Sequence, residues 1–248
     1  MPLATPVQQQ NSMSKWPKVL PPLSAEQKRI NDDFMEYWHD VLPNRYSIAD
    51  KFCHQYPVIH GPRNFQRTLE VGAGLGEHIE YEKLTPEQES NYFALDSREN
   101  MIERLKARFP KVHGCLGDCQ ARLNFPDGYF DRIVAINVLE HLPDLPRAVD
   151  EMYRLCNKEK GFFSVIIPCE GGMAYGLARR ISAQRIFQKR YPGVPYKLFI
   201  GREHINVPSE IYEELDRHFQ IVERTFFPFP MPFEFCNLFI GLTLRPKS

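Results

Sequence analysis

A glycine-rich turn follows the first buried-looking apolar run and is the first place where this sequence could hold a ligand. Glu70, Gly72 and Gly74 belong to the stretch Glu-Val-Gly-Ala-Gly-Leu-Gly at residues 70–76. Glycines at a strand-to-helix turn let the backbone bend sharply and approach a ligand closely. Nucleotide, flavin and sulfonium sites all use such turns, so the turn alone predicts a binding site and not its ligand.

The charges around this turn disfavour a ligand with phosphates. Glu77 stands where the dinucleotide fingerprint has its third glycine, and Glu70 lies at the end of the apolar run. Both carboxylates would repel a pyrophosphate at the start of the next helix. A phosphate-binding loop of an NTPase would continue with a Lys-Ser/Thr pair, and no such pair follows this turn. The chain also lacks the Tyr-x-x-x-Lys pair that is typical of some nicotinamide oxidoreductases. S-adenosylmethionine lacks phosphate and carries a sulfonium and an ammonium, so it fits these charges.

Polar residues also follow the next apolar runs. Asp96 and Ser97 end the second run, and an acid at this place in parallel α/β sheets hydrogen-bonds ribose hydroxyls. Either residue could also cap the helix expected at 98–109, which is compatible with ribose binding. Asp118 and Cys119 follow the third run, where a carboxylate can accept a hydrogen bond from an adenine amino group.

Two histidines are candidates for acid–base chemistry. His141 follows the fourth run and is expected at the mouth of the site, where it could remove a proton from a hydroxyl nucleophile. A histidine there could equally hydrogen-bond the backbone and shape the loop. His204 is a second candidate. Both could be structural, because a group transfer to a nucleophile that is already reactive can proceed by positioning alone.

A basic block lies late in the chain. Residues 179–202 contain seven Lys or Arg and no acid. This pattern is common on a solvated helix face. It also suits a grip on an anionic substrate such as a carboxylate, a phosphate or a nucleotide-linked sugar. The candidate substrate-binding residues are Tyr175, Arg179, Arg180, Arg185 and Arg202.

Short apolar runs alternate with helical periodicity in the middle of the chain. Such alternation predicts a parallel sheet with helices on both faces. A helix at 208–219 and two further strands follow, and the polar stretch 85–91 is expected to be a loop. The expected strands are 67–71, 91–95, 112–116, 130–136, 161–167, 220–226 and 237–244, and the clearest intervening helices are 98–109 and 146–156.

Together these stretches resemble the class I S-adenosylmethionine-dependent methyltransferases, and more narrowly their small-molecule branch (type 11, ubiquinone-biosynthesis type). The resemblance covers about 67–168, through LEVGAGLG, ALDSRENM, LGDCQARLNFPDGYFDRIVAINVLEHLPD and FFSVIIP. It implies a Rossmann-like α/β fold with a seven-stranded, mostly parallel sheet whose last strand is antiparallel. It also implies S-adenosylmethionine as cofactor. Gly72 and Gly74 would flank its methionine part, Asp96 would hold the ribose, and Asp118 and Cys119 the adenine. Asn137 would lie beside the sulfonium. Family members often have Asp where this chain has Glu70.

The resemblance and the composition predict a domain organisation. Residues 1–23, rich in Pro, Gln and Ser, are expected to be a flexible tail. Amphipathic periodicity at Ile30, Phe34, Tyr37, Trp38 and Val41 begins an N-terminal helical cap over 24–60. The methyltransferase domain is expected at 61–248, with a substrate-lid insertion at 170–206 between strands five and six.

Composition narrows the class of protein. The 248 residues carry no formal net charge, so no general attraction to nucleic acid or to an anionic membrane is expected. Six irregularly spaced cysteines predict reduced thiols and no metal site. Without a bilayer-spanning apolar run or a secretory signal, we expect a cytoplasmic protein that does not insert stably into membranes. The aromatic residues leave a homodimer open.

The predicted activity is O-methylation of a small or carrier-linked anionic metabolite. N-methylation of a small molecule is the close alternative. A catalytically silent adenosylmethionine-binding partner protein is a different class that these residues leave open. The reaction is an in-line displacement at the methyl carbon, for which the protein must align the nucleophile and exclude water.

Overall fold

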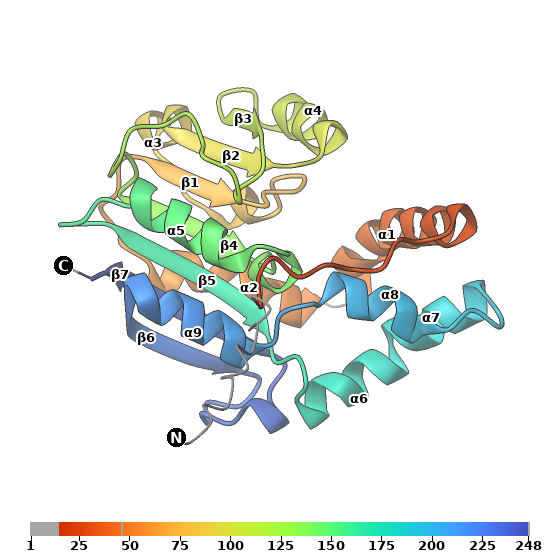
Figure 1. Ribbon diagram of the computed structural model, residues 1–248. Helices are drawn as coiled ribbons and strands as arrows, with labels where there is room; N and C mark the ends of the chain where they lie inside the picture. Colours follow the sequence, from red (N-terminus) through yellow and green to blue (C-terminus); the bar gives the residue numbers. More distant parts are fainter. Residues whose placement is uncertain (1–14, 46, 248) are drawn as a thin grey trace, which may run out of the picture.

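A seven-stranded sheet forms the body of the protein in the computed structural model, which describes residues 15–45 and 47–247 (Figure 1). The strand order is β3-β2-β1-β4-β5-β7-β6, and β7 is antiparallel to both of its neighbours while the other pairs are parallel. This confirms the predicted Rossmann-like fold. The strands are β1 (Thr68–Val71), β2 (Tyr92–Asp96), β3 (His113–Leu116), β4 (Arg132–Ile136), β5 (Phe162–Pro168), β6 (Phe219–Phe227) and β7 (Phe239–Pro246).

The strand order reverses between β1 and β4, and this reversal locates the site. The chain runs outward from β1 to β2 and β3 and then returns to β4 on the other side of β1. Ligands of open α/β sheets bind at such a switch point, beyond the carboxyl ends of the strands. Val71, Asp96 and Ile136 end three of the strands that meet there.

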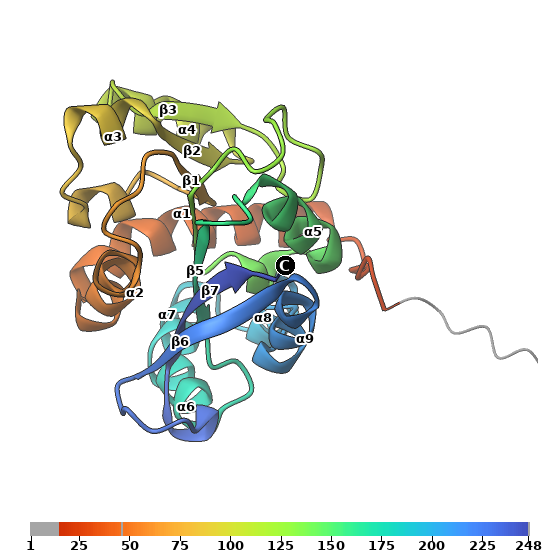
Figure 2. The ribbon, with the colours of Figure 1, turned by 90° about the vertical axis from the view of Figure 1, so that its left-hand side faces the viewer.

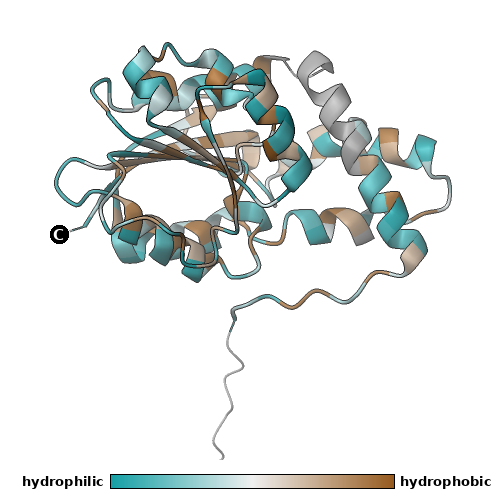
Figure 3. Ribbon diagram, turned by 90° about the horizontal axis from the view of Figure 1, so that it is seen from above, coloured by the Kyte–Doolittle hydropathy of each residue, from teal (hydrophilic) through white to brown (hydrophobic). Residues whose placement is uncertain are grey.

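Helices cover both faces of the sheet (Figure 2). Side chains of α5 (Leu145–Leu155) and α9 (Pro208–His218) pack with the sheet in one large apolar cluster. The opposite face packs against α2 (Ser47–His60) and α4 (Glu99–Arg108). The ribbon coloured by hydropathy shows apolar strands enclosed by helices with polar outer surfaces (Figure 3). The predicted parallel sheet with two covered faces is therefore confirmed.

The expected N-terminal cap divides into two parts. The α2 helix packs on the sheet, where the hydroxyls of Tyr56 and Thr243 are 3.2 Å apart and the Tyr56 ring covers Gly241. In contrast, α1 (Ala25–Arg45) extends away from the sheet (Figure 1). Of the two helices, therefore, α1 has the position expected of a cap, whereas α2 is part of the sheet's covering layer. The side chains of Trp38 and Val41, which contributed to the periodicity of α1, lie outside the described residues.

The insertion between β5 and β6 forms the other half of the cap. Its helices are α6 (Met173–Ile181), α7 (Ala183–Arg190) and α8 (Tyr196–Glu203). An apolar cluster joins α1 to this insertion, and the rings of Phe34 and Phe187 meet edge to face with centroids 4.9 Å apart. Among the described residues these buried aromatic side chains form an apolar cluster of their own, distinct from the main core, and hold the cap together.

The described parts of two segments that were expected to be irregular make defined contacts. Residues 1–14 of the predicted tail lie outside the described residues, but Lys18 donates to the Ile205 carbonyl at 2.7 Å and pairs with Glu210 at 2.6 Å. The stretch 85–91 is not simply a loop, because it contains α3 (Pro86–Ser90). A capping box between Thr85 and Gln88 starts that helix.

A buried ionic network lies under α2. The Arg132 guanidinium is 2.5 Å from Glu82, which also lies 2.9 Å from Nε2 of His78. His78 belongs to the 3-10 turn η1 (His78–Tyr81), and Arg132 begins β4. All three side chains are at most 4% exposed. Burial alone would raise the pKa of Glu82, but His78 and Arg132 outweigh it and hold the pKa at about 2.

Within the described part of the chain, no helix has the length and apolar character needed to cross a bilayer.

Candidate functional site

A cavity of about 770 Å³ lies at the switch point, between the carboxyl ends of the strands and the cap. Its walls come from β1, β2 and β4 on one side and from α1, α6 and α8 on the other. The structure brings twelve of the predicted site residues to it. These are Glu70, Gly72, Gly74, Asp96, Ser97, Asp118, Cys119, Asn137, His141, Tyr175, Arg179 and His204.

The glycine turn brings bare backbone to the cavity. Gly72 has a φ of 68°, and a Cβ there would lie 2.4 Å from Cγ2 of Val138. Gly74 has a φ of 54°, and its N–H donates to Oδ2 of Asp96 at 3.0 Å. The Glu77 carboxylate folds back onto the turn and accepts the Leu75 N–H at 3.0 Å. The turn therefore presents a negative charge, as the sequence predicted.

Glu70 is a buried acid at the floor of the site. It is 3% exposed and accepts a hydrogen bond from the Tyr92 hydroxyl at 2.8 Å. Burial raises its pKa to about 8, and the Tyr92 hydrogen bond opposes this shift. A cation placed nearby would favour the ionised carboxylate. Without such a cation Glu70 is largely protonated near pH 7, so the negative charge expected here from the sequence depends on a positively charged ligand group.

Asp96 is held in place on both sides. Its Oδ1 accepts the Arg98 N–H at 2.9 Å and the Arg98 Nε–H at 3.1 Å, while Oδ2 is bound to the glycine turn. This fixes the carboxylate at the cavity wall. The α4 helix begins at Glu99 with Arg98 at the N-cap. Capping of α4 by Asp96 or Ser97 was therefore a wrong prediction.

Asp118 and Cys119 line the cavity beyond β3. Asp118 is exposed, and its Oδ1 accepts the backbone and side-chain N–H groups of Gln120 at 2.9 and 3.0 Å. Cys119 is buried, and burial raises the pKa of its thiol to about 12. It is therefore an uncharged packing surface. The pair offers one carboxylate and one apolar contact, as a purine requires.

Asn137 combines backbone strain with an unmatched polar atom. Its φ of 52° makes it the one non-glycine residue with positive φ among the described residues. Its buried Oδ1 has no hydrogen-bond partner in the described structure. Such strain and unpaired buried acceptors concentrate at ligand sites. Asn137 directly follows β4 and lines the cavity beside the glycine turn, where a ligand donor could bind its Oδ1.

His141 has a defined tautomer. Its Nδ1 contacts the Glu203 carbonyl, which can only accept, so Nδ1 carries the proton and Nε2 keeps its lone pair. Burial lowers the pKa of His141 to about 4, and His204 adds to this effect. About a third of the side chain stays accessible in the cavity wall. His141 is neutral near pH 7.

Glu140 was not among the residues predicted from the sequence, although it neighbours His141. It is 1% exposed, lines the cavity, and its Oε2 has no hydrogen-bond partner in the described structure. Its Oε1 lies 3.7 Å from Nε2 of His141. Burial raises the pKa of Glu140 to about 7, opposed by the charge of His204. An unpaired buried carboxyl that titrates near neutrality is typical of active sites.

The turn that carries Glu140 is clamped from the far end of the lid. The 3-10 turn η2 (Leu139–His141) is bound by Asn206, whose Nδ2 donates to the carbonyls of Leu139 and Leu142 at 2.7 and 2.8 Å. The Glu140 carbonyl accepts the N–H groups of Ile205 and Asn206. Neither Asn206 nor this clamp had a sequence signal, because the pairing joins residues more than sixty positions apart.

His204 and Arg179 share a carboxylate that the sequence did not single out. Glu170 lies 3.1 Å from Nδ1 of His204 and is bound in two contacts of 2.5 and 2.7 Å by Arg179. Burial would raise the pKa of Glu170, but His204 and Arg179 together lower it. Tyr175 stacks on the His204 ring with centroids 6.1 Å apart. The charge of Arg179 is therefore already balanced.

Three of the predicted substrate-binding arginines lie elsewhere. Arg180 and Arg185 are exposed, and the Arg202 guanidinium donates to the Pro21 carbonyl. Among the described residues that line the cavity, none of the three occurs. For Arg180 and Arg185 the structure agrees with the solvated helix face, one of the two interpretations that the sequence allowed, because charge clustering is visible in a sequence and the direction of each helix face is not.

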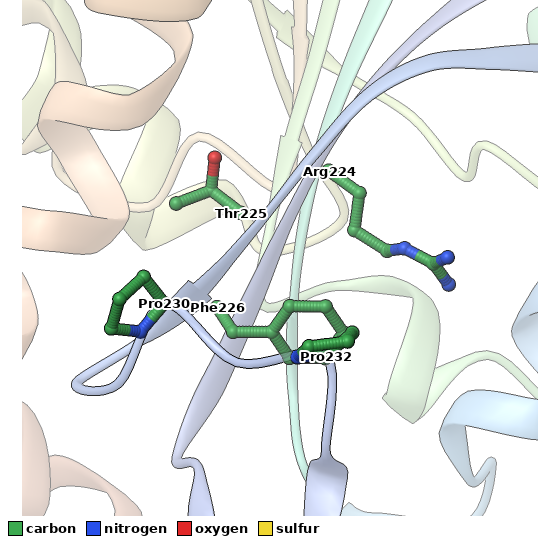
Figure 4. Close-up of a pocket in the computed structure, with 5 residues that line it drawn as sticks. All are labelled: Arg224, Thr225, Phe226, Pro230 and Pro232. Atoms are coloured by element: carbon green, nitrogen blue, oxygen red, sulfur yellow. The ribbon is translucent and has the colours of Figure 1, made fainter.

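A second hollow of about 420 Å³ lies at the end of β6 (Figure 4). It is lined by Arg224, Thr225, Phe226, Pro230 and Pro232, with Arg224 as its one charged residue. A lone arginine beside prolines offers no acid–base pair. The larger cavity is therefore the candidate for chemistry.

The sequence and the fold of this chain are both similar to those of known methyltransferases. Residues 69–165 match the family described as a methyltransferase domain (Methyltransf_11). No curated protein matches the sequence.

Three solved structures illustrate the shared fold. A possible histamine N-methyltransferase of Thermotoga maritima is 18% identical with a TM-score of 0.61, covering 88% of this chain and 99% of that chain. A TehB-like S-adenosylmethionine-dependent methyltransferase of Corynebacterium glutamicum is 15% identical with a TM-score of 0.56, covering 89% and 100%. The trans-methyltransferase CalH in complex with S-adenosylhomocysteine is 21% identical with a TM-score of 0.58, covering 87% and 64%.

Proposed function

We propose that this chain, a class I S-adenosylmethionine-dependent methyltransferase of the small-molecule type, methylates a small acceptor that binds between Glu140 and the lid helices α6 and α8. One observation carries the proposal. A single cavity joins the glycine turn and its acids to a buried, unpaired carboxyl that titrates near neutral pH.

The residues at the strand ends fit the cofactor. S-adenosylmethionine, when bound, supplies a methyl group activated by its sulfonium. Gly72 and Gly74 give backbone access, Asp96 faces the site as a fixed acceptor, and the unpaired Oδ1 of Asn137 awaits a donor. Glu70 balances positive charge, since ionising its buried carboxyl is favoured by a nearby cation.

Glu140 is the group that we infer to take the proton from the acceptor. Its Oε2 is the unpaired oxygen, and the clamp by Asn206 fixes the turn that carries it. A base is most effective when its pKa lies near the working pH, because it is then both largely ionised and basic enough. At a pKa of about 7, Glu140 meets this condition.

His141 is the alternative base, and the structure favours it less. The Nε2 lone pair is available, but a pKa of about 4 makes it a weak proton acceptor. We infer that His141 instead shapes the wall beside Glu140. His204, the second candidate, faces Glu170 through Nδ1 and contributes to the charge around Glu140.

The charges in the cavity bear on the acceptor. Beyond the acids at the strand ends, Asp50, Glu140 and Glu203 line the wall. Arg179 also lines it, but its charge is balanced by Glu170. We therefore infer a reacting end that is neutral or cationic, a hydroxyl or an amine. Among the described residues that line the cavity, Arg179 pairs with Glu170 and Arg98 pairs with Asp96, so neither arginine favours the anionic acceptor expected from the basic block.

The acceptor class can be tested directly. Radiolabelled S-adenosylmethionine is incubated with matched sets of small amines, neutral alcohols or phenols, and carboxylated analogues. We expect methyl transfer to amines or hydroxyls. The KM should be higher for analogues that carry a carboxylate next to the nucleophile. Preferred methylation of the carboxylated set would overturn the inferred charge preference. Failure of every set together with failure to bind S-adenosylhomocysteine would remove the proposed function itself.

Substitution of Asp96 tests the placement of the cofactor. We expect Asp96→Ala to weaken binding of S-adenosylhomocysteine by about 1–3 kcal/mol, or about five- to 150-fold, because an acceptor for the ribose hydroxyls and for the Gly74 N–H is lost. Isothermal titration calorimetry measures this change. Asp127→Ala, at an exposed carboxylate paired with Arg154, is the control and should bind normally. An unchanged affinity in Asp96→Ala would remove Asp96 from the cofactor site.

A further inference from the structure

The outer face of α6 is apolar and exposed. Met173, Leu177 and Ile181 are 77%, 61% and 65% exposed, and their spacing of four residues places them in one stripe along the helix. The inner face of the same helix contributes Tyr175 and Arg179 to the cavity. The stripe is therefore not turned toward any core within the described residues.

A second exposed apolar segment lies beside this stripe. The link between β6 and β7 carries Phe229, Met231, Phe233 and Phe235, each between 46% and 56% exposed. It meets the start of α6 where the backbone of Gly172 packs against the Glu234 carbonyl, and Figures 1 and 2 both show the link next to α6. These four residues with Met173, Leu177 and Ile181 are called the apolar patch below. Clustered exposed apolar side chains of this kind mark an interaction surface.

Positive charge exceeds negative charge along the lid that follows the start of the patch, whose link carries one acid, Glu234. Residues 171–202 contain no Asp or Glu. Arg180 lies seven residues after Met173 and therefore on the same side of α6 as the stripe. Arg179 and Arg190 are paired with Glu170 and Asp33, and Arg202 is bound to the Pro21 carbonyl. Arg180, Arg185, Lys189 and Lys197 are exposed.

We propose that the apolar patch and these four cations dock the lid onto the surface of an anionic lipid membrane. Apolar side chains that enter the headgroup region, combined with cations attracted to anionic lipid, are the two contributions that hold peripheral proteins on bilayers. Each Lys or Arg near such a surface adds about fivefold to binding. Docking on a surface requires no membrane-spanning helix.

Charge is the reason to prefer a membrane over a second copy of the chain. A twofold contact through the patch would place the same surface on both subunits. The stretch 171–202, which has no acid, would then face its own copy and bring like charges together. An anionic bilayer instead offers the complementary charge to both the stripe and its cations. Because docking needs neither cofactor nor acceptor, it is independent of the proposed methyl transfer.

Vesicle co-sedimentation of the full chain tests the proposal. We expect binding to vesicles of phosphatidylcholine with phosphatidylglycerol, weakened by added salt, and little binding to phosphatidylcholine alone. Arg180→Glu with Arg185→Glu, and separately Leu177→Ser with Ile181→Ser, should each weaken binding by about tenfold or more. Ile59→Ser is the matched control, since Ile59 is 64% exposed on α2, away from the lid.

Two results would overturn the proposal. One is vesicle binding that is absent or that neither pair of substitutions weakens. The other is a dimer, seen by analytical ultracentrifugation, that Leu177→Ser with Ile181→Ser dissociates. Retained affinity for S-adenosylhomocysteine shows that each variant is folded. If the serine variant does not fold, the charge-reversed variant, altered only at exposed residues, still decides between these outcomes.

Discussion

Glu140→Gln lowers kcat by about 10²- to 10³-fold and leaves S-adenosylhomocysteine affinity nearly unchanged, because the substitution removes a proton acceptor while preserving the shape of the side chain. Glu140 lines the cavity, its carboxyl is buried, and one carboxyl oxygen has no partner among the described residues. Steady-state kinetics with an identified acceptor and calorimetry with S-adenosylhomocysteine measure the two quantities. A loss confined to KM would instead assign Glu140 to acceptor binding.

The pH profile separates the two candidate bases. A base acts only when deprotonated, so the rate falls as the pH drops below its pKa. If Glu140 is the base, kcat/KM for the acceptor decreases as the pH is lowered below about 7, and Glu140→Gln abolishes this decrease. If His141 is the base, kcat/KM decreases only near pH 4, and His141→Asn abolishes this decrease. Saturating S-adenosylmethionine keeps the titration of Glu70, near pH 8, out of the measurement.

Glu82→Gln lowers the free energy of unfolding by about 3–5 kcal/mol at pH 7, because it leaves the buried Arg132 guanidinium without its charge partner. Urea denaturation monitored by circular dichroism measures the change. Glu89→Gln breaks the pair with the mostly exposed Lys111 and serves as the control, with an expected loss below about 1 kcal/mol. Equal losses in the two variants would contradict the importance assigned to the buried network.

The same substitution has a pH dependence of known sign. The folded-state pKa of Glu82, about 2, lies below its ordinary value of 4.5, so its ionised form is stabilised by folding. That contribution is complete above about pH 4.5 and is lost as the pH falls toward 2. The difference in stability between wild type and Glu82→Gln should therefore shrink between pH 4.5 and 3. A constant difference over this interval would show that the charge of Glu82 is not what stabilises the fold.

Local patterns made the cofactor side of the cavity predictable. Gly72 and Gly74 serve a turn that needs positive φ, and Asp96 ends a strand whose direction and neighbours follow from alternation of strands and helices. Each of these signals spans a few residues. The sheet order then brings them together without any further information.

The acceptor side of the cavity could not be predicted from the sequence, because it depends on contacts between residues far apart in the chain. Glu140 looked like one more polar residue, because its burial and raised pKa arise when the lid returns to η2 through Asn206. Arg179 looked like a free cation until the fold placed Glu170 against it. Helix periodicity also joined α1 and α2 into one cap, although their buried faces meet different partners.

The clamp at Asn206 has a consequence for the catalytic cycle. The lid leaves the sheet at Cys169, whose N–H donates to the Leu238 carbonyl, and rejoins it at Ile205 and Asn206, which bind the Glu140 carbonyl. Because both ends are hydrogen-bonded in this way, we expect any outward movement of the lid to pivot about these two points. Opening would carry Tyr175 and Arg179 outward and leave Glu140 in place on the sheet. Product could then depart, and the next acceptor enter, without the proton acceptor having to be rebuilt at each turnover.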